Sequence, residues 1–275
     1  MSRRIALLIA IAACGGDSEP TARPRVFGGD RPVTLQVPAD FDPAQRYPLV
    51  LILHGYGANG FVQQAYFGLS GEADRRQVMT LAPDGLVDST NMQFWNADPF
   101  CCDFDGRNPD DVGYLGDLVE DVMDAWPVDA AAVFAIGYSN GGFMSYRMAC
   151  ERADLFAGIV SLAGNASSIT CDPSEPVNVV HAHGTTDATV PFSGAVPSVD
   201  QWAGLNGCTG TRAPGADLDL EQSLPGAETH TATTAGCPEG GSVALWSIEG
   251  AGHIPAFGPA FEPTVWQWFT DHRRP

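Results

Sequence analysis

The 275-residue chain contains no lysine, so all fourteen of its basic residues are arginine, against 33 acidic residues. The formal net charge of −19 at pH 7 disfavours nucleic acid and anionic membranes as partners, because both repel an acidic surface. The apolar run near the N-terminus, residues 5–13, is too short to span a bilayer as a helix. The sequence contains no internal repeats and no segment able to form a second core. The length therefore predicts a single domain over residues 30–275.

The N-terminus has the pattern of an export signal. Arg3 and Arg4 precede the apolar run 5–13, which matches the basic and apolar regions of a signal peptide. Residues 11–14, Ile-Ala-Ala-Cys, resemble a bacterial lipobox. We therefore expect a signal peptide over residues 1–13, lipidation of Cys14 and a flexible tether over residues 14–29. An ordinary secretory signal cut nearby is the alternative. Both interpretations predict an exported protein, extracellular or in the cell envelope, that contacts a membrane only through a lipid on Cys14.

Six cysteines follow the lipobox, and none of them forms a C-x-x-C pair. The missing spacing argues against zinc, and no metal is expected. An even number of cysteines in an exported chain predicts three disulfides, with free thiols as the alternative. We expect Cys208 to pair with Cys237, which would stabilise the fold by about 3–4 kcal/mol. The adjacent Cys101 and Cys102 are expected to form disulfides with Cys150 and Cys171. The spacing leaves open which of the two bonds to which.

The segment Gly137-Tyr138-Ser139-Asn140-Gly141 is the most informative motif in the chain. It directly follows an apolar run, residues 131–136, and precedes a stretch with helical character, residues 143–149. A serine at such a strand–turn–helix junction is held at the end of a sheet, and the flanking glycines relieve crowding in a strained turn. Ser139 is therefore the expected catalytic nucleophile.

An acid and a histidine follow this serine in the order that α/β-hydrolases use. Asp187 comes just after an apolar, β-branched run, residues 177–183, and His253 follows a further strand, residues 243–248. Open parallel sheets place their active sites at the C-terminal ends of the strands, where all three residues are expected. Taken alone, Asp187 could be an ordinary turn residue. Its place between the serine and the histidine predicts the catalytic triad Ser139, Asp187 and His253.

Acyl transfer by such a triad needs an oxyanion hole but no cofactor. The residue after the nucleophile supplies one backbone N–H, which here is Asn140. The second N–H comes from the loop after an early strand. Residues 49–57 are an apolar run followed by a glycine-rich loop, and we expect the Tyr56 N–H to serve. Tyr56 is also an expected substrate contact.

Trp95 is the second expected substrate contact, because a long loop after a strand offers an indole as a wall for an acyl group. The alternative is that Trp95 packs on the disulfides. His54, His181 and His183 are expected to be structural, and a metal pair at 181 and 183 lacks a third ligand at useful spacing. Acidic residues between 103 and 111 leave calcium as an alternative, although their spacing is not that of an EF-hand.

Strands and helices alternate along the chain. Apolar runs at 31–37, 78–82 and 156–162 predict further strands, the first of them an edge strand. Apolar spacing from residue 115 to 126 predicts an amphipathic helix capped by Asp110 or Asp111, with other helices at 61–77 and 263–271. Residues 209–241 are polar and glycine-rich, and we expect an excursion pinned by the last disulfide. The whole pattern predicts an α/β-hydrolase fold, a mostly parallel, doubly wound sheet with helices on both faces.

These motifs together resemble the secreted polyhydroxybutyrate depolymerase family of esterases, which also includes feruloyl and acetylxylan esterases. The resemblance covers about residues 30–270. Its matching segments are 53–57, Trp95 with Cys101-Cys102, 110–115, 137–142, 183–187, 206–208 and 250–253. The resemblance implies an α/β-hydrolase fold, hydrolysis of carboxylic esters and the same triad. A small or oligomeric ester is the expected partner, and a monomer is the expected state.

Members of this family differ in the ester that they cleave. We expect a hydroxybutyrate oligoester first, and a feruloyl or acetylxylan ester as the alternative. Ile254-Pro255-Ala256 follows the histidine where many relatives have an aromatic residue before the proline, so the leaving-group side is expected to differ. A serine peptidase of the same fold and a non-catalytic surface lipoprotein are the alternatives from other classes.

Overall fold

The computed structural model of the chain describes residues 23–166 and 170–275. The signal peptide predicted over 1–13, the lipidation site Cys14 and residues 14–22 of the tether lie outside the described residues. Within the described part, no helix combines the length and the apolar character needed to cross a bilayer.

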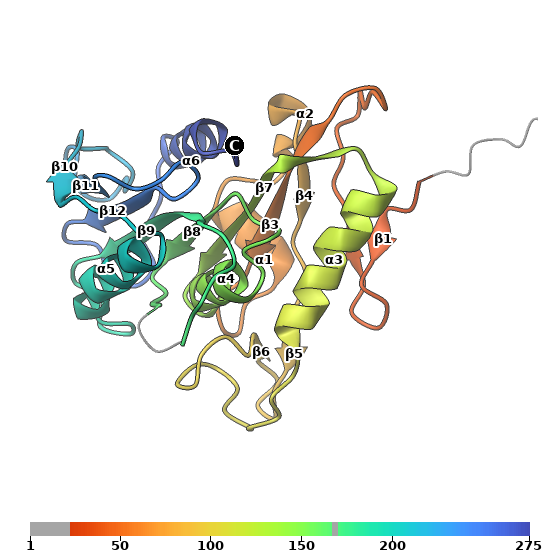
Figure 1. Cartoon of the computed structure of the whole chain (residues 1–275). Helices are drawn as coiled ribbons and strands as arrows, with labels where there is room; N and C mark the ends of the chain where they lie inside the picture. The colour runs from red at the N-terminus through yellow and green to blue at the C-terminus, as the bar shows by residue number, and fades with distance from the viewer. Residues whose placement is uncertain (1–22, 167–169) are drawn as a thin grey trace, which may run out of the picture.

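An eight-stranded sheet forms the centre of the fold (Figure 1). Six neighbouring strands are parallel and lie in the spatial order β12–β9–β8–β7–β3–β4. Each of the six lies on or overlaps a run that the sequence marks as apolar, which confirms the predicted α/β-hydrolase fold. Their bounds are Tyr47–Leu53 for β3, Met79–Leu81 for β4, Val128–Tyr138 for β7, Gly158–Leu162 for β8, Asn178–Gly184 for β9 and Val243–Ile248 for β12.

Helices cover both faces of this sheet, because side chains alternate along each buried strand. Leu49 and Leu51 of β3 pack in one core cluster, and Val50 and Ile52 of the same strand pack in another. The first cluster includes residues of α3 (Asp111–Ala125), α4 (Asn140–Glu151) and α5 (Ala195–Leu205). The second includes residues of α6 (Phe261–Asp271) and residues just after α1 (Gly60–Tyr66), which the short α2 (Glu72–Arg76) follows (Figure 1).

The segment 209–241, which we expected to be an excursion, adds two strands to the edge of the sheet. β10 (Arg212–Pro214) and β11 (Thr229–Thr234) pair antiparallel beside β12. Their polar composition hides them in the sequence, although the threonines of β11 are β-branched and favour extended backbone. The expected disulfide between Cys208 and Cys237 closes this segment.

The other four cysteines pair differently from the expectation. Cys101 bonds with its neighbour Cys102, and Cys150 of α4 bonds with Cys171. The Cα atoms of Cys150 and Cys171 lie 5.6 Å apart, an ordinary disulfide separation that leaves the adjacent pair only each other. Three disulfides in the described part of the chain are typical of a protein that matures outside the cytoplasm.

The domain begins before residue 30. β1 (Val26–Phe27) pairs with β2 (Val33–Thr34), and Phe27 is buried in the core. The Trp126 Nε1–H donates to the Pro24 carbonyl at 2.7 Å. Because these contacts hold the segment in place, the tether predicted to run to residue 29 ends earlier. Of the edge strand predicted over residues 31–37, only β2 is regular.

A long segment between β4 and α3 passes beside the ends of the parallel strands. It contains a small hairpin, β5 (Leu86–Val87) and β6 (Gln93–Phe94) (Figure 1). The vicinal disulfide of residues 101 and 102 follows the hairpin. A short 3-10 turn, η1 (Phe192–Gly194), follows the loop after β9. These connections supply most of the side chains around the candidate site.

The buried carboxylate of Asp111 joins the start of α3 to the N-terminal segment. It accepts from the Arg31 guanidinium at 2.6 Å and from the Asn96 N–H at 2.8 Å. Since breaking a buried ion pair strands a charge, we expect Arg31→Met to lower the free energy of unfolding by about 2–4 kcal/mol in urea denaturation. Arg212→Met removes a pair with the exposed Asp200 and should cost less than about 1 kcal/mol. Equal losses in the two variants would contradict this assignment.

Candidate active site

Ser139 lies in the tight turn between β7 and α4, at φ 53° and ψ −116°. A positive φ is strained for a residue with a side chain, and such strain is typical of functional turns. The turn also needs the glycines on either side. A Cβ on Gly137 would lie 2.0 Å from the Gly141 carbonyl oxygen, and one on Gly141 would lie 2.1 Å from the Leu53 carbonyl oxygen. The motif therefore forms the nucleophile turn that the sequence predicts.

The structure brings Ser139, His253 and Asp187 together from three different loops. The Ser139 hydroxyl lies 3.0 Å from His253 Nε2, and His253 Nδ1 lies 2.7 Å from Asp187 Oδ2. A carboxylate accepts only, so His253 Nδ1 carries the proton in this pair and Nε2 is left to accept from the serine. This is the arrangement in which a neutral imidazole can remove the serine proton.

The carboxylate of Asp187 is held on both oxygens. Its Oδ1 accepts from the backbone N–H groups of Thr189 and Val190 at 2.8 and 2.9 Å, which leaves Oδ2 facing His253. The side chain is buried, so few water molecules compete for these bonds. Asp187 is therefore a fixed anion behind the histidine.

The His253 loop is held by a segment from outside the parallel strands. The Ala256 N–H donates to Glu221 Oε1 at 2.9 Å, and the Ala256 carbonyl accepts from the Gln222 N–H at 2.9 Å. Tyr66 of α1 donates its hydroxyl to the Pro255 carbonyl at 2.9 Å. Both residues that follow Ile254 are thus fixed through their backbone.

Of the two residues expected to form the oxyanion hole, Asn140 directly follows Ser139, and Tyr56 lines the same pocket as Ser139. The Asn140 N–H is the first of α4, so it has no carbonyl one turn earlier in the helix to bond with. The Tyr56 peptide is fixed from both sides, because the Gly55 N–H donates to Gln63 Oε1 at 3.2 Å and the Gly57 N–H donates to the Gln93 carbonyl at 2.8 Å.

Trp95 does not form a wall of the pocket, and the expectation that it contacts substrate was wrong. Its side chain is fully buried, its ring packs on His54 with 4.9 Å between centroids, and its Nε1–H donates to the His54 carbonyl at 3.1 Å. Its backbone is bonded twice to the Asn140 side chain, which accepts from the Trp95 N–H at 2.7 Å and donates to the Trp95 carbonyl at 2.9 Å. Through Asn140 and His54, Trp95 thus supports the two segments that are expected to form the oxyanion hole.

His54 completes this support as a neutral ring. Its Nδ1–H donates to the Gly55 carbonyl at 2.8 Å, and its Nε2 accepts from the Gly85 N–H at 2.8 Å. Burial lowers the pKa of His54, which keeps the ring in the neutral form that both bonds require.

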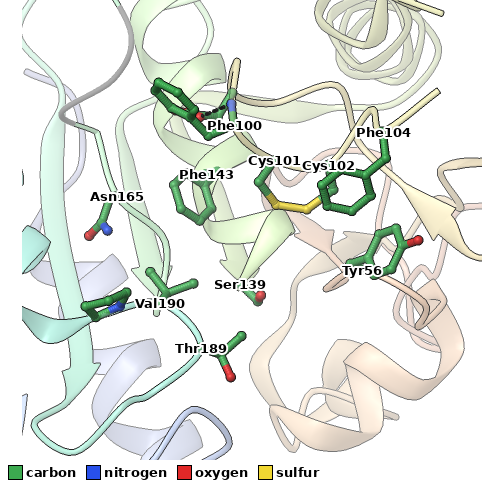
Figure 2. A pocket seen from close by; sticks show the side chains of 12 residues that line it. Tyr56, Phe100, Cys101, Cys102, Phe104, Ser139, Phe143, Asn165, Thr189 and Val190 are labelled. Atoms are coloured by element: carbon green, nitrogen blue, oxygen red, sulfur yellow. Dashed lines mark hydrogen bonds between the residues drawn. A yellow bond between two sulfur atoms is a disulfide. The ribbon is translucent and has the colours of Figure 1, made fainter. Parts of the chain in front are cut away.

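A pocket of about 690 Å³ opens beside Ser139. Figure 2 shows Tyr56, Phe104 and the vicinal disulfide on one side of the serine, with Asn165, Thr189 and Val190 on the other. Tyr56, which we expect to contact substrate, lines this pocket. Its hydroxyl donates to Asp88 at 2.5 Å, and its ring meets Phe104 edge-on with 5.3 Å between centroids. The remaining lining residues are Asp98, Phe100, Phe143 and Pro191.

Sequence reasoning missed most of this lining. Phe100, Phe104 and Phe143 carry no motif, and the side-chain role of Asn140 is visible only once the chain is folded. The one available signal was the aromatic content of residues 100–104 beside the paired cysteines. No cluster of three or more histidine, cysteine or acidic side chains suited to a metal ion occurs in residues 23–166 and 170–275.

The chain is similar to proteins named as feruloyl esterases. The chain is 32% identical to a probable feruloyl esterase C of Aspergillus niger over 65% of its own length and 63% of the relative, so it spans just under two thirds of that protein. It is 28% identical to feruloyl esterase C of Emericella nidulans over 87% of its own length and 83% of the relative.

Solved structures with low sequence identity share the fold. An acetyl xylan esterase from Aspergillus awamori superimposes with a TM-score of 0.64 at 16% identity, covering 88% of this chain and 94% of that one. A thermostable esterase gives a TM-score of 0.59 at 17% identity, with coverage of 88% and 59%. The family model described as Phospholipase/Carboxylesterase matches residues 37–215, a span that contains the serine turn and Asp187. With the sheet order and the serine turn, this match shows that the chain belongs to the phospholipase/carboxylesterase family and has the α/β-hydrolase fold.

Proposed function

We propose that the protein hydrolyses esters of aromatic, hydroxycinnamoyl-type acids through Ser139, His253 and Asp187. The observation that carries this proposal is the pocket beside Ser139, which is large and bordered by the rings of Tyr56, Phe100, Phe104 and Phe143. An acetyl group would leave most of its 690 Å³ empty, whereas a planar aromatic acyl group can pack against several rings. Similarity to proteins named feruloyl esterase supports the same substrate class.

The proposed reaction is a two-step acyl transfer. His253 Nε2 takes the Ser139 proton as the oxygen attacks the ester carbonyl, and the Asn140 and Tyr56 N–H groups stabilise the oxyanion. The imidazolium, stabilised by Asp187, then protonates the leaving alcohol and an acyl-enzyme forms. Water activated by His253 releases the acid and regenerates the serine. Every proton in this scheme moves through His253, so the reaction needs no other acid or base.

A hydroxybutyrate oligoester is the second candidate substrate. The observation in its favour is the exposed apolar rim of the same pocket, where Phe100 is 81% and Phe104 is 65% exposed. Such a rim suits contact with an apolar oligomer as well as with an aromatic acid.

A panel of substrates tests these assignments directly. We would measure kcat/KM for methyl ferulate, a hydroxybutyrate oligomer, an acetylated xylo-oligosaccharide and a peptide amide. A preference for methyl ferulate supports the proposal. A preference for the hydroxybutyrate oligomer would move the assignment to the second candidate. Cleavage of the peptide and not of the esters would make the protein a peptidase.

The aromatic rim should affect large acyl groups and not small ones. We expect Phe100→Ala combined with Phe104→Ala to lower kcat/KM for methyl ferulate by about 10-fold, since each aromatic contact contributes roughly 0.5–1.5 kcal/mol. The value for p-nitrophenyl acetate should stay within about two-fold, because an acetyl group does not reach the rim. Phe61→Ala is the matched control, because this ring of α1 is 79% exposed and does not line the pocket. Equal losses on both esters would contradict the placement of the acyl group.

We further propose that the protein is exported and anchored through a lipid on Cys14. The lipobox-like residues 11–14 and the three disulfides support this location. Mass spectrometry of the mature N-terminus should find a lipid-modified cysteine, and Cys14→Ser should move the enzyme from the membrane fraction to the soluble fraction. An unmodified mature N-terminus at another residue would favour the ordinary secretory signal.

A further inference from the structure

A line of buried polar side chains runs from α4 along β9 to Asp187. It starts at the Tyr146 hydroxyl of α4, which lies 2.9 Å from His181 Nδ1. His181 Nε2 lies 3.0 Å from His183 Nδ1 on the same strand, β9. His183 Nε2 lies 2.8 Å from the Val190 carbonyl and 3.2 Å from Asp187 Oδ2. The reaction as described above uses none of the first three side chains.

The end of this line fixes where every proton sits. A carbonyl oxygen only accepts, so His183 Nε2 must carry the hydrogen that faces Val190. His183 Nδ1 is then an acceptor, and His181 Nε2 must donate to it. His181 Nδ1 is left as an acceptor for the Tyr146 hydroxyl. One tautomer of each histidine satisfies the whole line.

Both rings are neutral in this arrangement. Burial lowers the pKa of His183, and it holds the pKa of His181 well below its usual range, with the neighbouring His183 acting in the same direction. Tyr146, His181 and His183 are all fully buried, so water does not replace any of these bonds. The neutral rings therefore act as fixed donors and acceptors.

His183 reaches Asp187 by two routes. Its Nε2 lies directly beside Oδ2, the oxygen that faces His253. It also bonds the carbonyl of Val190, whose own N–H donates to Asp187 Oδ1. We propose that His183 is a positioning residue for ester hydrolysis, holding the Asp187 turn so that Oδ2 stays in line with His253.

This inference rests on the proposed role of Asp187 in the reaction. A carboxylate that can rotate lets the His253 ring drift away from Ser139, and misplacement by about 1 Å can cost on the order of 10²-fold in rate. His183 does not line the pocket and meets it only through the backbone carbonyl of Val190, so substrate binding should change little. A loss in kcat without a matching rise in KM is therefore the expected signature.

Two polar substitutions distinguish the contribution of His183 Nε2, which faces Asp187, from that of Nδ1, which faces His181. The amide nitrogen of Gln reaches the position of the histidine Nε2, whereas Asn reaches only as far as Nδ1. We expect His183→Asn to lower kcat by about 10–100-fold with KM within about three-fold, and His183→Gln to stay within about five-fold of the wild type in kcat. His230→Leu, a change at an exposed histidine of β11, serves as the control and should leave both constants unchanged.

A measurement on the unmodified enzyme covers the case in which a variant does not fold. With ¹⁵N-labelled histidine, the His183 ring should be neutral and protonated on Nε2 near neutral pH. A ring protonated on Nδ1, a folded His183→Asn with wild-type kcat, or a His183→Gln as slow as His183→Asn would each overturn the inference. Ser139→Ala in the same assays separates the two levels. Activity in Ser139→Ala would contradict the proposed triad itself. An inactive Ser139→Ala together with wild-type kcat in both His183 variants would contradict only the proposed role of His183.

Discussion

Ser139→Ala is expected to lower kcat for ester hydrolysis by at least ~10³-fold while the protein stays folded. The substitution removes the oxygen that lies 3.0 Å from His253 Nε2, so no atom remains to attack the ester carbonyl. Alanine keeps the Cβ that the strained turn already accommodates, and the helix and strand on either side are unchanged. Turnover of p-nitrophenyl butyrate, with circular dichroism of both proteins, measures the effect.

A second serine near the pocket supplies the control for this variant. Ser193 in η1 is exposed, and Ser193→Ala should have wild-type activity. A fluorophosphonate should label the wild type and the Ser193 variant at residue 139 and leave Ser139→Ala unlabelled. Wild-type turnover in a folded Ser139→Ala would show that another group is the nucleophile.

Asp187→Asn is expected to lower kcat by about 10³–10⁴-fold, although it changes the size of the side chain very little. The Thr189 and Val190 N–H groups need an acceptor, so the amide oxygen of Asn takes the place of Oδ1. The amide NH₂ then faces His253 Nδ1, which must accept instead of donate. Nε2 carries the proton in that tautomer and can no longer receive one from Ser139.

An exposed aspartate gives the matched control for Asp187→Asn. Asp219 lies on the surface, and Asp219→Asn should keep wild-type kcat. Steady-state kinetics on methyl ferulate or p-nitrophenyl butyrate compare the two variants. A folded Asp187→Asn with less than about ten-fold loss in kcat would mean that the carboxylate does not select the His253 tautomer.

The sequence predicts the parallel core well because each buried strand lies on or overlaps a mostly apolar run. The runs at 177–183 and 243–248 correspond to β9 and β12 within one residue at either end. The order of Ser139, Asp187 and His253 could be interpreted because each residue follows such a run. The cap of α3 was also predictable, since Asp110 accepts from the Gly113 N–H at 2.8 Å, as a helix N-cap does.

Features that depend on which way a loop folds were not predictable. Nothing in the spacing of Cys101 and Cys102 distinguishes a bond between them from bonds to distant cysteines. Trp95 sits on a loop without periodicity, so the sequence does not indicate that its ring turns inward onto His54. α5 was missed as well. The strands of residues 209–241 were hidden by their polar side chains, because strand pairing and not apolar content holds them in place: β11 pairs with β12, and β10 pairs with β11.

The His253 loop is attached to residues 221 and 222, so different segments of the chain face the alcohol part and the acyl part of the ester. Evolution or engineering could therefore change one part without the other. Ile254, which is 69% exposed, follows His253, the residue proposed to protonate the departing alcohol, and the backbone just beyond it is held by Glu221. The acyl pocket is built from other segments, chiefly residues 98–104 and 189–191. Exchange of residues 216–228 between homologues should therefore change alcohol preference while acyl preference is inherited intact, so that new specificities can be assembled one side at a time.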